Sequence, residues 1–238
     1  MQPAHDPLAA YELARQRLRQ ELTGRLPACA DLEGTITAYA YWVCTGTQRP
    51  GAEWEATVRR HVDLALARAG DEAEAERLEI TLLRRHLAER ASSLLDVGAG
   101  WGRLAPLYEE AGLRAVYVEP EPLGVRLMQR AGLAAVQALG ERLPFAGGAF
   151  ATIVMGWVLH HGQKLDAAAI VRQVARVAGP AGLLLSIEPL GFGFDEARWT
   201  ALLGENGFRV RDVQVYHTTA VADEESERYA LAVAEAAH

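Results

Sequence analysis

From residue 93 onward, short apolar runs alternate with segments of helical periodicity, and this alternation restricts the possible folds more than any other feature of the chain. The predicted strands contain LLDV, AVYVE, AAVQA, ATIVMG, GLLLSIE, RVRDVQVYH and RYALAVAE. Helices are predicted between them over residues 102–111, 122–131, 165–177 and 195–206. This order predicts an α/β fold with a mostly parallel sheet and helices on both of its faces. No helix is predicted between the last two strands, which indicates an antiparallel hairpin at an edge of the sheet.

The N-terminal part of the chain follows a different pattern. Residues 8–22 and about 58–90 have helical periodicity. One face of the second helix carries Leu78, Leu82, Leu83 and Leu87. The aromatic stretch between the two helices has no charge before Arg49, so it is expected either to pack inside the protein or to face a ligand. We therefore predict a helical appendage over residues 1–90, acting as a lid, and a core domain over residues 91–238.

The charge balance argues against nucleic acid as a partner. The net charge is −7, and the basic residues are scattered rather than gathered into the stripe typical of proteins that bind a phosphate backbone. The pairs Arg59-Arg60 and Arg84-Arg85 lie in acid-rich helical segments, where a solvated face is expected.

The sequence indicates neither a membrane span nor secretion. No segment approaches the ~18 uninterrupted apolar residues of a membrane helix. The first 20 residues lack the basic and then apolar pattern of a signal peptide. Cys29 and Cys44 do not have the spacing of a metal site and are expected to be ordinary buried thiols in a reducing compartment. A cytoplasmic location is therefore expected.

The segment LLDVGAGWGR places three glycines at alternate positions after the first predicted strand. In open parallel sheets, ligands bind outside the carboxyl ends of the strands, and glycines there let a ligand approach the backbone. A dinucleotide-binding Gly-x-Gly-x-x-Gly pattern would need a glycine where Arg103 stands, which disfavours a nicotinamide enzyme. The carboxylate of Asp96 suits a ligand with an ammonium group, such as an amino acid moiety.

The second predicted strand ends at Glu119, 21 residues beyond Gly98. An acid at this place can accept hydrogen bonds from both hydroxyls of a ribose. An amino acid together with a ribose is the combination found in S-adenosylmethionine.

These segments resemble the class I S-adenosylmethionine-dependent methyltransferases, and among them the small-molecule branch that includes the ubiquinone/menaquinone-type enzymes. The similar motifs are, in the family's order, LDVGAGWGR, VYVEPEP, ERLPFAGGAFATIVMGWVLHH and VARVAGPAGLLLSIEP, within a resemblance over residues 91–234. The resemblance implies a Rossmann-like, seven-stranded sheet whose last strand is antiparallel, with S-adenosylmethionine as the cofactor. It implies cofactor contacts at Asp96, Gly98, Ala99, Gly100, Gly102, Glu119, Pro120, Leu139, Gly140, Glu141 and Met155.

The sequence departs from the family's pattern in the loop after the third strand. The family usually has an acid there that holds the adenine amino group, whereas this chain has Leu139, followed by Gly140 and Glu141. The adenine is then expected to be held by packing, by backbone groups, or by Glu141 displaced along the loop. A second departure is Ala151, where the family usually has Asp. These departures motivate an alternative function, a cofactor-binding protein without catalysis that acts as a regulatory or assembly subunit.

Two histidines after the fourth strand are the candidate catalytic bases. By the resemblance, His160 and His161 lie next to where the methyl group points, and histidine is the commonest base near neutral pH. His160 is the preferred base, and a packing or capping role for the pair stays open. No cluster of carboxylates follows this strand, so no metal is predicted.

The predicted reaction is methyl transfer to a small-molecule acceptor, at an oxygen, nitrogen or carbon atom. The identity of the acceptor stays open, as does the oligomeric state, for which a homodimer is one alternative. Several aromatic side chains of the appendage are expected either to enclose the acceptor pocket or to form an aromatic core: Tyr39, Tyr41, Trp42, Trp54 and His61.

Overall fold

The computed structural model describes residues 6–46, 51–87, 93–161, 165–191, 194–218 and 228–237. The chain forms two compact units, residues 1–76 and residues 77–238. The boundary between the units falls inside one long helix, so the last turns of that helix belong to the second unit. Each unit is described by itself.

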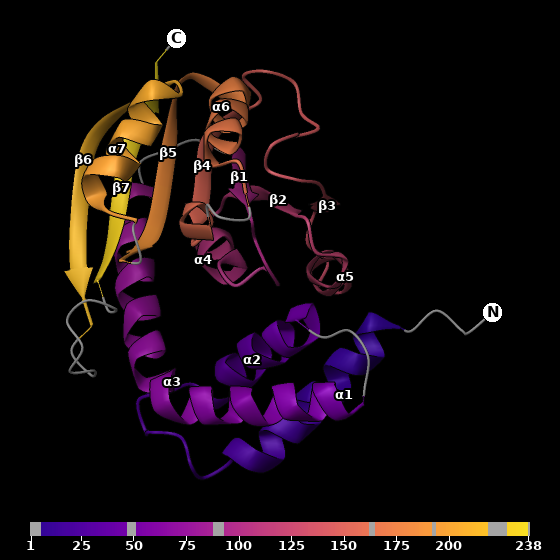
Figure 1. Ribbon diagram of the computed structural model, residues 1–238. Helices are drawn as coiled ribbons and strands as arrows, with labels where there is room; N and C mark the ends of the chain where they lie inside the picture. Colours follow the sequence, from indigo (N-terminus) through magenta and orange to yellow (C-terminus); the bar gives the residue numbers. More distant parts are fainter. Residues whose placement is uncertain are drawn as a thin grey trace. The chain divides into compact units, whose positions relative to one another are not determined.

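The first unit is helical (Figure 1). It contains α1 (Pro7–Leu22), α2 (Leu32–Gly46) and the first two thirds of α3 (Ala52–Leu87). The α1 helix begins at Asp6, whose side chain accepts a hydrogen bond of 3.1 Å from the Leu8 N–H and so caps the free end of the helix. Its buried face has residues three or four apart, as an amphipathic helix requires: Ala10, Tyr11, Ala14, Leu18 and Leu22.

The uncharged aromatic stretch forms most of α2, and its best-buried aromatic side chains pack within the first unit. Tyr39 is 1% exposed, and its hydroxyl lies 2.9 and 3.0 Å from the two carboxylate oxygens of Glu72 on α3. The Tyr39 ring also packs edge-on against Trp42, with the ring centroids 4.8 Å apart. Trp54 is likewise buried. Of the two expectations for this stretch, the structure places Tyr39 and Trp54 in an aromatic core.

The second unit contains a seven-stranded sheet in the order β3-β2-β1-β4-β5-β7-β6 (Figure 1). The strands are β1 (Ser93–Val97), β2 (Arg114–Glu119), β3 (Ala135–Gln137), β4 (Phe150–Gly156), β5 (Ala178–Leu190), β6 (Phe208–His217) and β7 (Arg228–Ala236). The helices are α4 (Ala105–Glu110), α5 (Pro122–Arg130), α6 (Ala167–Val177) and α7 (Glu196–Glu205), with a short 3-10 helix, η1 (Leu159–His161). The β7 strand runs antiparallel to both β5 and β6, whereas the pairs from β3 to β5 are parallel. The predicted fold class, including the antiparallel hairpin, is confirmed.

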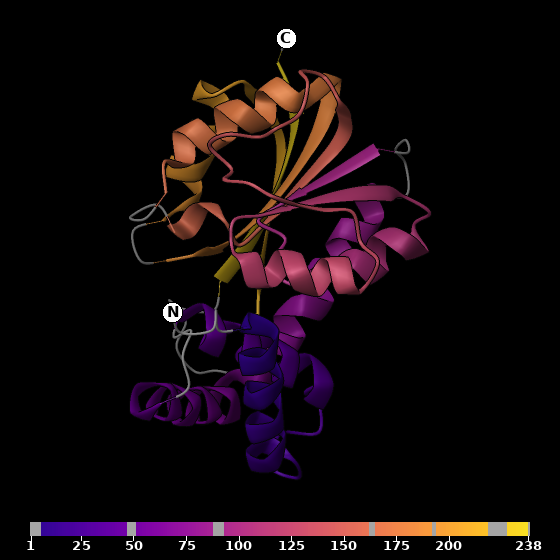
Figure 2. The same ribbon diagram turned by 90° about the vertical axis from the view of Figure 1, so that its right-hand side faces the viewer.

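Helices cover both faces of this sheet, and α4 and α6 lie on opposite sides of the strands (Figure 2). The reason is the alternation of side chains along β1. Leu95 and Val97 point to the core that is shared with α6 and α7, whereas Asp96 points to the other face, where it meets Tyr108 of α4. Because both faces are covered, the central strands are almost wholly apolar.

Two predicted boundaries differ from the structure. The helix predicted over 102–111 begins only at Ala105, because residues 101–104 form a turn and Pro106 occupies the first helical turn, where no N–H donor is needed. The strand predicted from Gly182 already begins at Ala178, which pairs with Phe150 before a shift of register.

The prediction of two buried thiols is wrong for Cys29. Cys44 lies in the buried face of α2, but Cys29 is exposed in the turn between α1 and α2, where the chain has no core to enter. The arginine pairs of α3, residues 59–60 and 84–85, are exposed as predicted. Among the described residues, none of the helices combines the length and the apolar character needed to cross a membrane.

Candidate cofactor site

The loop after β1 lies against β2 and carries the three alternating glycines. The N–H groups of Gly98 and Ala99 both donate to the Val118 carbonyl, at 2.8 and 3.1 Å, which fixes the start of the loop at the carboxyl end of the sheet. A Cβ on Gly98 would lie 2.6 Å from Val158 Cγ2, and one on Gly102 would lie 2.9 Å from Leu133 Cδ1. These two glycines are therefore required by packing.

Gly100 differs from the other two glycines in its surroundings. All three have a left-handed φ, which is 59° at Gly100, but only a Cβ added to Gly100 would meet no atom within 4 Å. Open space beside bare backbone is the arrangement that allows a ligand to come close to the main chain. Of the three glycines, Gly100 is therefore the one that best fits the predicted ligand site at this loop.

Glu119 ends β2 and is tied to the glycine loop. One carboxylate oxygen accepts from the Gly100 N–H at 2.7 Å, and the other accepts from the Glu121 N–H at 3.0 Å. The residue is only 5% exposed. The two backbone donors therefore orient the carboxylate beside the glycine loop.

Sequence reasoning did not identify Gly124, at the start of α5, as part of this site. A Cβ on Gly124 would lie 2.3 Å from the Gly100 carbonyl oxygen and 2.8 Å from Glu119 Cγ. Only a glycine lets α5 begin this close to the loop. The one signal in the sequence was a glycine two residues after the helix-starting Pro122, where a residue with higher helix propensity would ordinarily stand.

Asp96 is buried beneath α4, at 3% exposure. The Tyr108 hydroxyl donates to Asp96 Oδ2 at 3.0 Å. Burial raises the pKa of Asp96 to about 7, against the lowering effects of the Tyr108 hydrogen bond and of the Arg103 charge. A direct contact of this carboxylate with a ligand ammonium group stays a prediction.

The loop after β3 exposes the apolar side chain of Leu139, which is 58% exposed. Gly140 packs on α6, because a Cβ there would lie 3.1 Å from Ile170 Cγ1. Glu141 accepts a long hydrogen bond of 3.4 Å from the Asp166 N–H through Oε1, while its buried Oε2 has no hydrogen-bond partner among the described residues. An exposed apolar surface and a buried carboxylate oxygen therefore lie in the same loop.

The other two predicted contacts have structural partners in the described residues. The Pro120 carbonyl accepts from the Gln137 side chain at 3.2 Å. Met155 is fully buried in the core beneath the site. Contact of either residue with a cofactor stays a prediction.

The candidate base His160 lies in η1, just after β4. Its side chain is 24% exposed, and its ring Nδ1 lies 3.0 Å from Oε2 of the buried Glu188 on β5. The side chain of His161 lies outside the described part of the structure. Val158, the residue just before η1, packs against Gly98 of the glycine loop, since a Cβ added to Gly98 would lie 2.6 Å from Val158 Cγ2.

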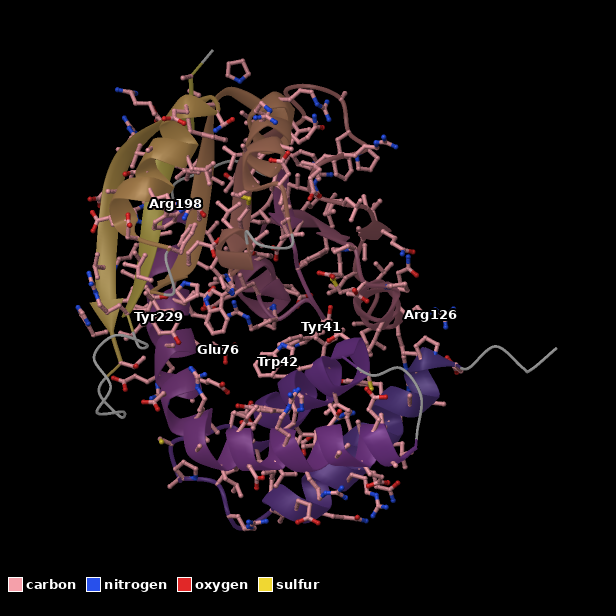
Figure 3. The ribbon with its side chains drawn as sticks, in the orientation of Figure 1. Tyr41, Trp42, Glu76, Arg126, Arg198 and Tyr229 are labelled. Atoms are coloured by element: carbon pink, nitrogen blue, oxygen red, sulfur yellow. The ribbon has the colours of Figure 1, made fainter. Side chains whose placement is uncertain are left out.

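A second feature that sequence reasoning missed lies at the same end of the sheet. Arg103 makes a bidentate ion pair with Glu79, with both distances 2.9 Å, and the Glu79 side chain is fully buried. The guanidinium also lies 5.4 Å from the centroid of the Trp157 ring, which stacks on Tyr229. Figure 3 shows Tyr229 at the start of β7, beside the carboxyl ends of the parallel strands. A local sequence pattern could not predict this ion pair, because Glu79 and Arg103 are 24 residues apart.

The arrangement offers bare backbone, an oriented carboxylate and an imidazole around one end of the sheet. Within the part of the chain that the structure describes, no three His, Cys, Asp or Glu side chains form a group that could hold a metal ion.

Comparisons with known proteins agree with this architecture. Residues 95–186 match the family described as methyltransferase domain. An uncharacterized methyltransferase of Mycobacterium leprae is 36% identical over 97 residues, which are 39% of this chain and 35% of the relative. The chain thus matches about a third of that relative's length.

Solved structures share the fold. The YcgJ protein of Bacillus subtilis aligns with a TM-score of 0.58 at 18% identity, covering 68% of this chain and 99% of that one. A SAM-dependent methyltransferase of Methanosarcina mazei aligns with a TM-score of 0.56 at 15% identity, covering 64% and 96%. The matched segment covers less than half of this chain, and the solved structures share its fold.

Proposed function

We propose that this protein binds S-adenosylmethionine and transfers its methyl group to a small-molecule acceptor without a metal ion. The observation that carries the proposal is the Glu119 carboxylate, which is held by the Gly100 and Glu121 N–H groups next to the open backbone of Gly100. Placement in the ubiquinone/menaquinone-type branch belongs to the same proposal and rests on the sequence resemblance. A cytoplasmic location is also proposed, and it rests on the cysteine usage and on the absence of a signal-peptide pattern in the first 20 residues.

The residues of this end of the sheet fit the cofactor's chemistry. Glu119 is a carboxylate that can accept from ribose hydroxyls, and Gly100 leaves room for a ligand against the main chain. The exposed side chain of Leu139 offers an apolar contact for the adenine ring, and the carboxylate of Glu141 in the same loop is a candidate acceptor for its amine. When bound, S-adenosylmethionine supplies a methyl group on a positively charged sulfur, which is reactive enough for direct displacement.

The protein's own task in such a displacement is to position the acceptor and to exclude water. An oxygen or carbon acceptor of high pKa also needs a base, and His160 is the candidate on this side of the sheet. A neutral amine acceptor already has a lone pair and needs no such base. Loss of activity on replacement of His160 would therefore indicate an oxygen or carbon acceptor, whereas retained activity would indicate an amine.

The alternative of a cofactor-binding protein without catalysis is favoured by one observation. Leu139, at the place where the family usually has an adenine-binding acid, is a solvent-exposed apolar side chain. Loss of this acid is the kind of change that a regulatory or assembly subunit tolerates.

Calorimetry with S-adenosylmethionine, S-adenosylhomocysteine and NADH tests the binding part of the proposal. We expect both sulfur ligands to bind, and Glu119→Ala to weaken them by ~1–3 kcal/mol through the loss of hydrogen bonds to a charged group. Glu235→Ala is the matched control, because that carboxylate lies near the other end of β7, where it pairs with Arg209 and Arg211. Binding of NADH without binding of the sulfur ligands would reject the proposal.

Catalysis is tested separately from binding. Native mass spectrometry of the purified protein identifies a retained cofactor or acceptor, and candidate acceptors of that class are then incubated with cofactor labelled in the methyl group. Transfer of label supports the enzyme. Tight binding of the cofactor, with no transfer to any retained acceptor, supports the non-catalytic alternative.

A further inference from the structure

Glu188 is a fully buried carboxylate near the end of β5, and the family motifs do not assign it a role. Its exposed fraction is 0%. A carboxylate in such a position is costly unless hydrogen bonds replace the water that it loses. The compensating donors therefore indicate what the residue does.

Four nitrogen atoms of one short segment lie within hydrogen-bond distance of this carboxylate. Oε1 accepts from the backbone N–H groups of Val158 and Leu159, at 3.1 and 2.8 Å. Oε2 accepts from the backbone N–H of His160 at 3.1 Å and lies 3.0 Å from the Nδ1 of the same residue. A single side chain on β5 thus holds both the backbone and the ring of the segment after β4.

The donors around Glu188 indicate which ring nitrogen of His160 carries the proton. The three backbone N–H groups can only donate, and hydrogen bonds to a carboxylate favour its ionised form. An ionised carboxylate can only accept, so the Nδ1 that lies 3.0 Å from Oε2 is expected to carry a proton. In a neutral imidazole the lone pair then resides on Nε2.

The neighbouring contacts hold this segment still. The Trp157 N–H donates to the Ile187 carbonyl at 2.7 Å, so the chain leaves β4 attached to the residue before Glu188. On the other side, Val158 lies against Gly98 of the glycine loop. The imidazole is thus fixed from β5, in a segment whose Val158 lies against the loop where the cofactor is proposed to bind.

We propose that Glu188 is a positioning residue, which holds His160 in the Nδ1–H tautomer and so presents Nε2 as the proton-accepting atom. The inference deepens the proposed function and rests on it for the identity of the proton donor, the methyl acceptor. The tautomer itself is independent of methyl transfer and can be measured without an acceptor.

The test uses the full-length protein with ¹⁵N-labelled histidine and long-range ¹H–¹⁵N correlation spectra at about pH 8, above the usual imidazole range. A His160→Phe sample identifies the His160 signals. In the unmodified protein we expect the Nδ1–H tautomer in an excess of about tenfold or more, since its hydrogen bond is to a charged group. An Nε2–H tautomer in the unmodified protein would overturn the inference, and this result needs no variant.

Glu188→Gln then tests the cause. The amide N–H₂ can donate to Nδ1, so the Nδ1–H excess is expected to fall by about tenfold or more. Glu188→Asp, which keeps the charge, is expected to retain more of the Nδ1–H form than Glu188→Gln. Glu235→Gln is the matched control, and its His160 signals should equal those of the unmodified protein. An unchanged tautomer in a folded Glu188→Gln protein would also overturn the inference.

Failure of the inference can be distinguished from failure of the proposed function. If the protein does not bind S-adenosylhomocysteine, the proposed function falls, whatever the tautomer of His160 is. If the ligand binds and the His160 tautomer does not depend on Glu188, only the positioning role falls.

Discussion

At the scale of single residues, the loop after β3 decides how the adenine amine is recognised. Leu139 stands where the family that the sequence resembles usually has an acid, and Glu141 two residues later has a buried oxygen with no hydrogen-bond partner among the described residues. This Oε2 favours the displaced Glu141 as the acceptor, because burial of an unpaired carboxylate oxygen costs free energy that a ligand amine would offset.

The first prediction compares two variants of this loop. Glu141→Ala is expected to weaken S-adenosylhomocysteine binding by ~1.5–3 kcal/mol, and to weaken an analogue without the adenine amine much less. If Glu141 contacts the amine, Leu139→Asp adds only repulsion and does not improve binding. Calorimetry of both variants with both ligands is the measurement. Equal effects on the two ligands in both variants would show that neither side chain contacts the amine.

The second prediction concerns the buried carboxyl of Asp96 and the pH dependence of stability. Its pKa is raised by burial to about 7 in the folded protein, whereas an unfolded Asp titrates near ~3.9. Between these pH values the folded state binds more protons than the unfolded state, so this group's contribution is fully present below about pH 4 and is lost as the pH rises through about 7. The contribution of Asp96 to the free energy of unfolding is expected to fall by about 4 kcal/mol over this pH range.

Asp96→Asn removes this titration and keeps an oxygen that can accept from Tyr108. We expect the free energy of unfolding of Asp96→Asn, minus that of the unmodified protein, to increase from pH 4 to pH 7 and then to level off. Urea unfolding at a series of pH values measures the difference. A difference that does not vary with pH would contradict the raised pKa.

At the scale of elements, the packing of α5 against the glycine loop fixes the site. Gly124, in the first turn of α5, lies against the Gly100 carbonyl and beside Glu119, so this contact joins the helix, the loop and β2. The contact explains how a loop without regular hydrogen bonding retains a defined shape.

The third prediction tests this contact with two helical glycines. Gly124→Ala is expected to destabilise the protein by about 1–3 kcal/mol, since the Cβ would overlap backbone, and to weaken S-adenosylhomocysteine binding at least about tenfold. Gly204→Ala on α7 is the matched control, because a Cβ there would meet nothing within 4 Å. The control should be neutral or stabilising by up to about 1 kcal/mol. A stabilised Gly124→Ala protein with unchanged affinity would show that the close approach is not required.

At the scale of the whole molecule, the chain divides into two units inside α3, at residues 76 and 77. The sequence predicted a change of pattern at residue 91 and a lid over residues 1–90. Burial of Tyr39 in the first unit explains part of the uncharged stretch without a ligand, while Trp42 is half-buried. The lid stays a prediction, and it is open to measurement.

The fourth prediction addresses the lid by hydrogen exchange. With S-adenosylhomocysteine, amides of residues 98–102 and 119–124 are expected to exchange more slowly. If the appendage covers the ligand, residues 34–46 are expected to slow as well, because ordering by a ligand suppresses local opening. NADH at the same concentration is the control ligand. Protection confined to residues 91–238 would show that the appendage has another role, such as dimerisation.

The sequence by itself determined the α/β class, the place of each strand to within a few residues, and the glycine loop followed by Glu119, because these features follow from local periodicity and from the residues next to a turn. Only the tertiary structure decided which distant side chains meet. Glu188 contacts His160 across 28 residues, and Gly124 fits beneath Gly100, because the order and register of the strands bring these segments together. The spacing of residues along the sequence does not show in which order the strands lie in the sheet. For this reason the cofactor loop could be predicted, whereas the group that orients the candidate base became visible only in the fold.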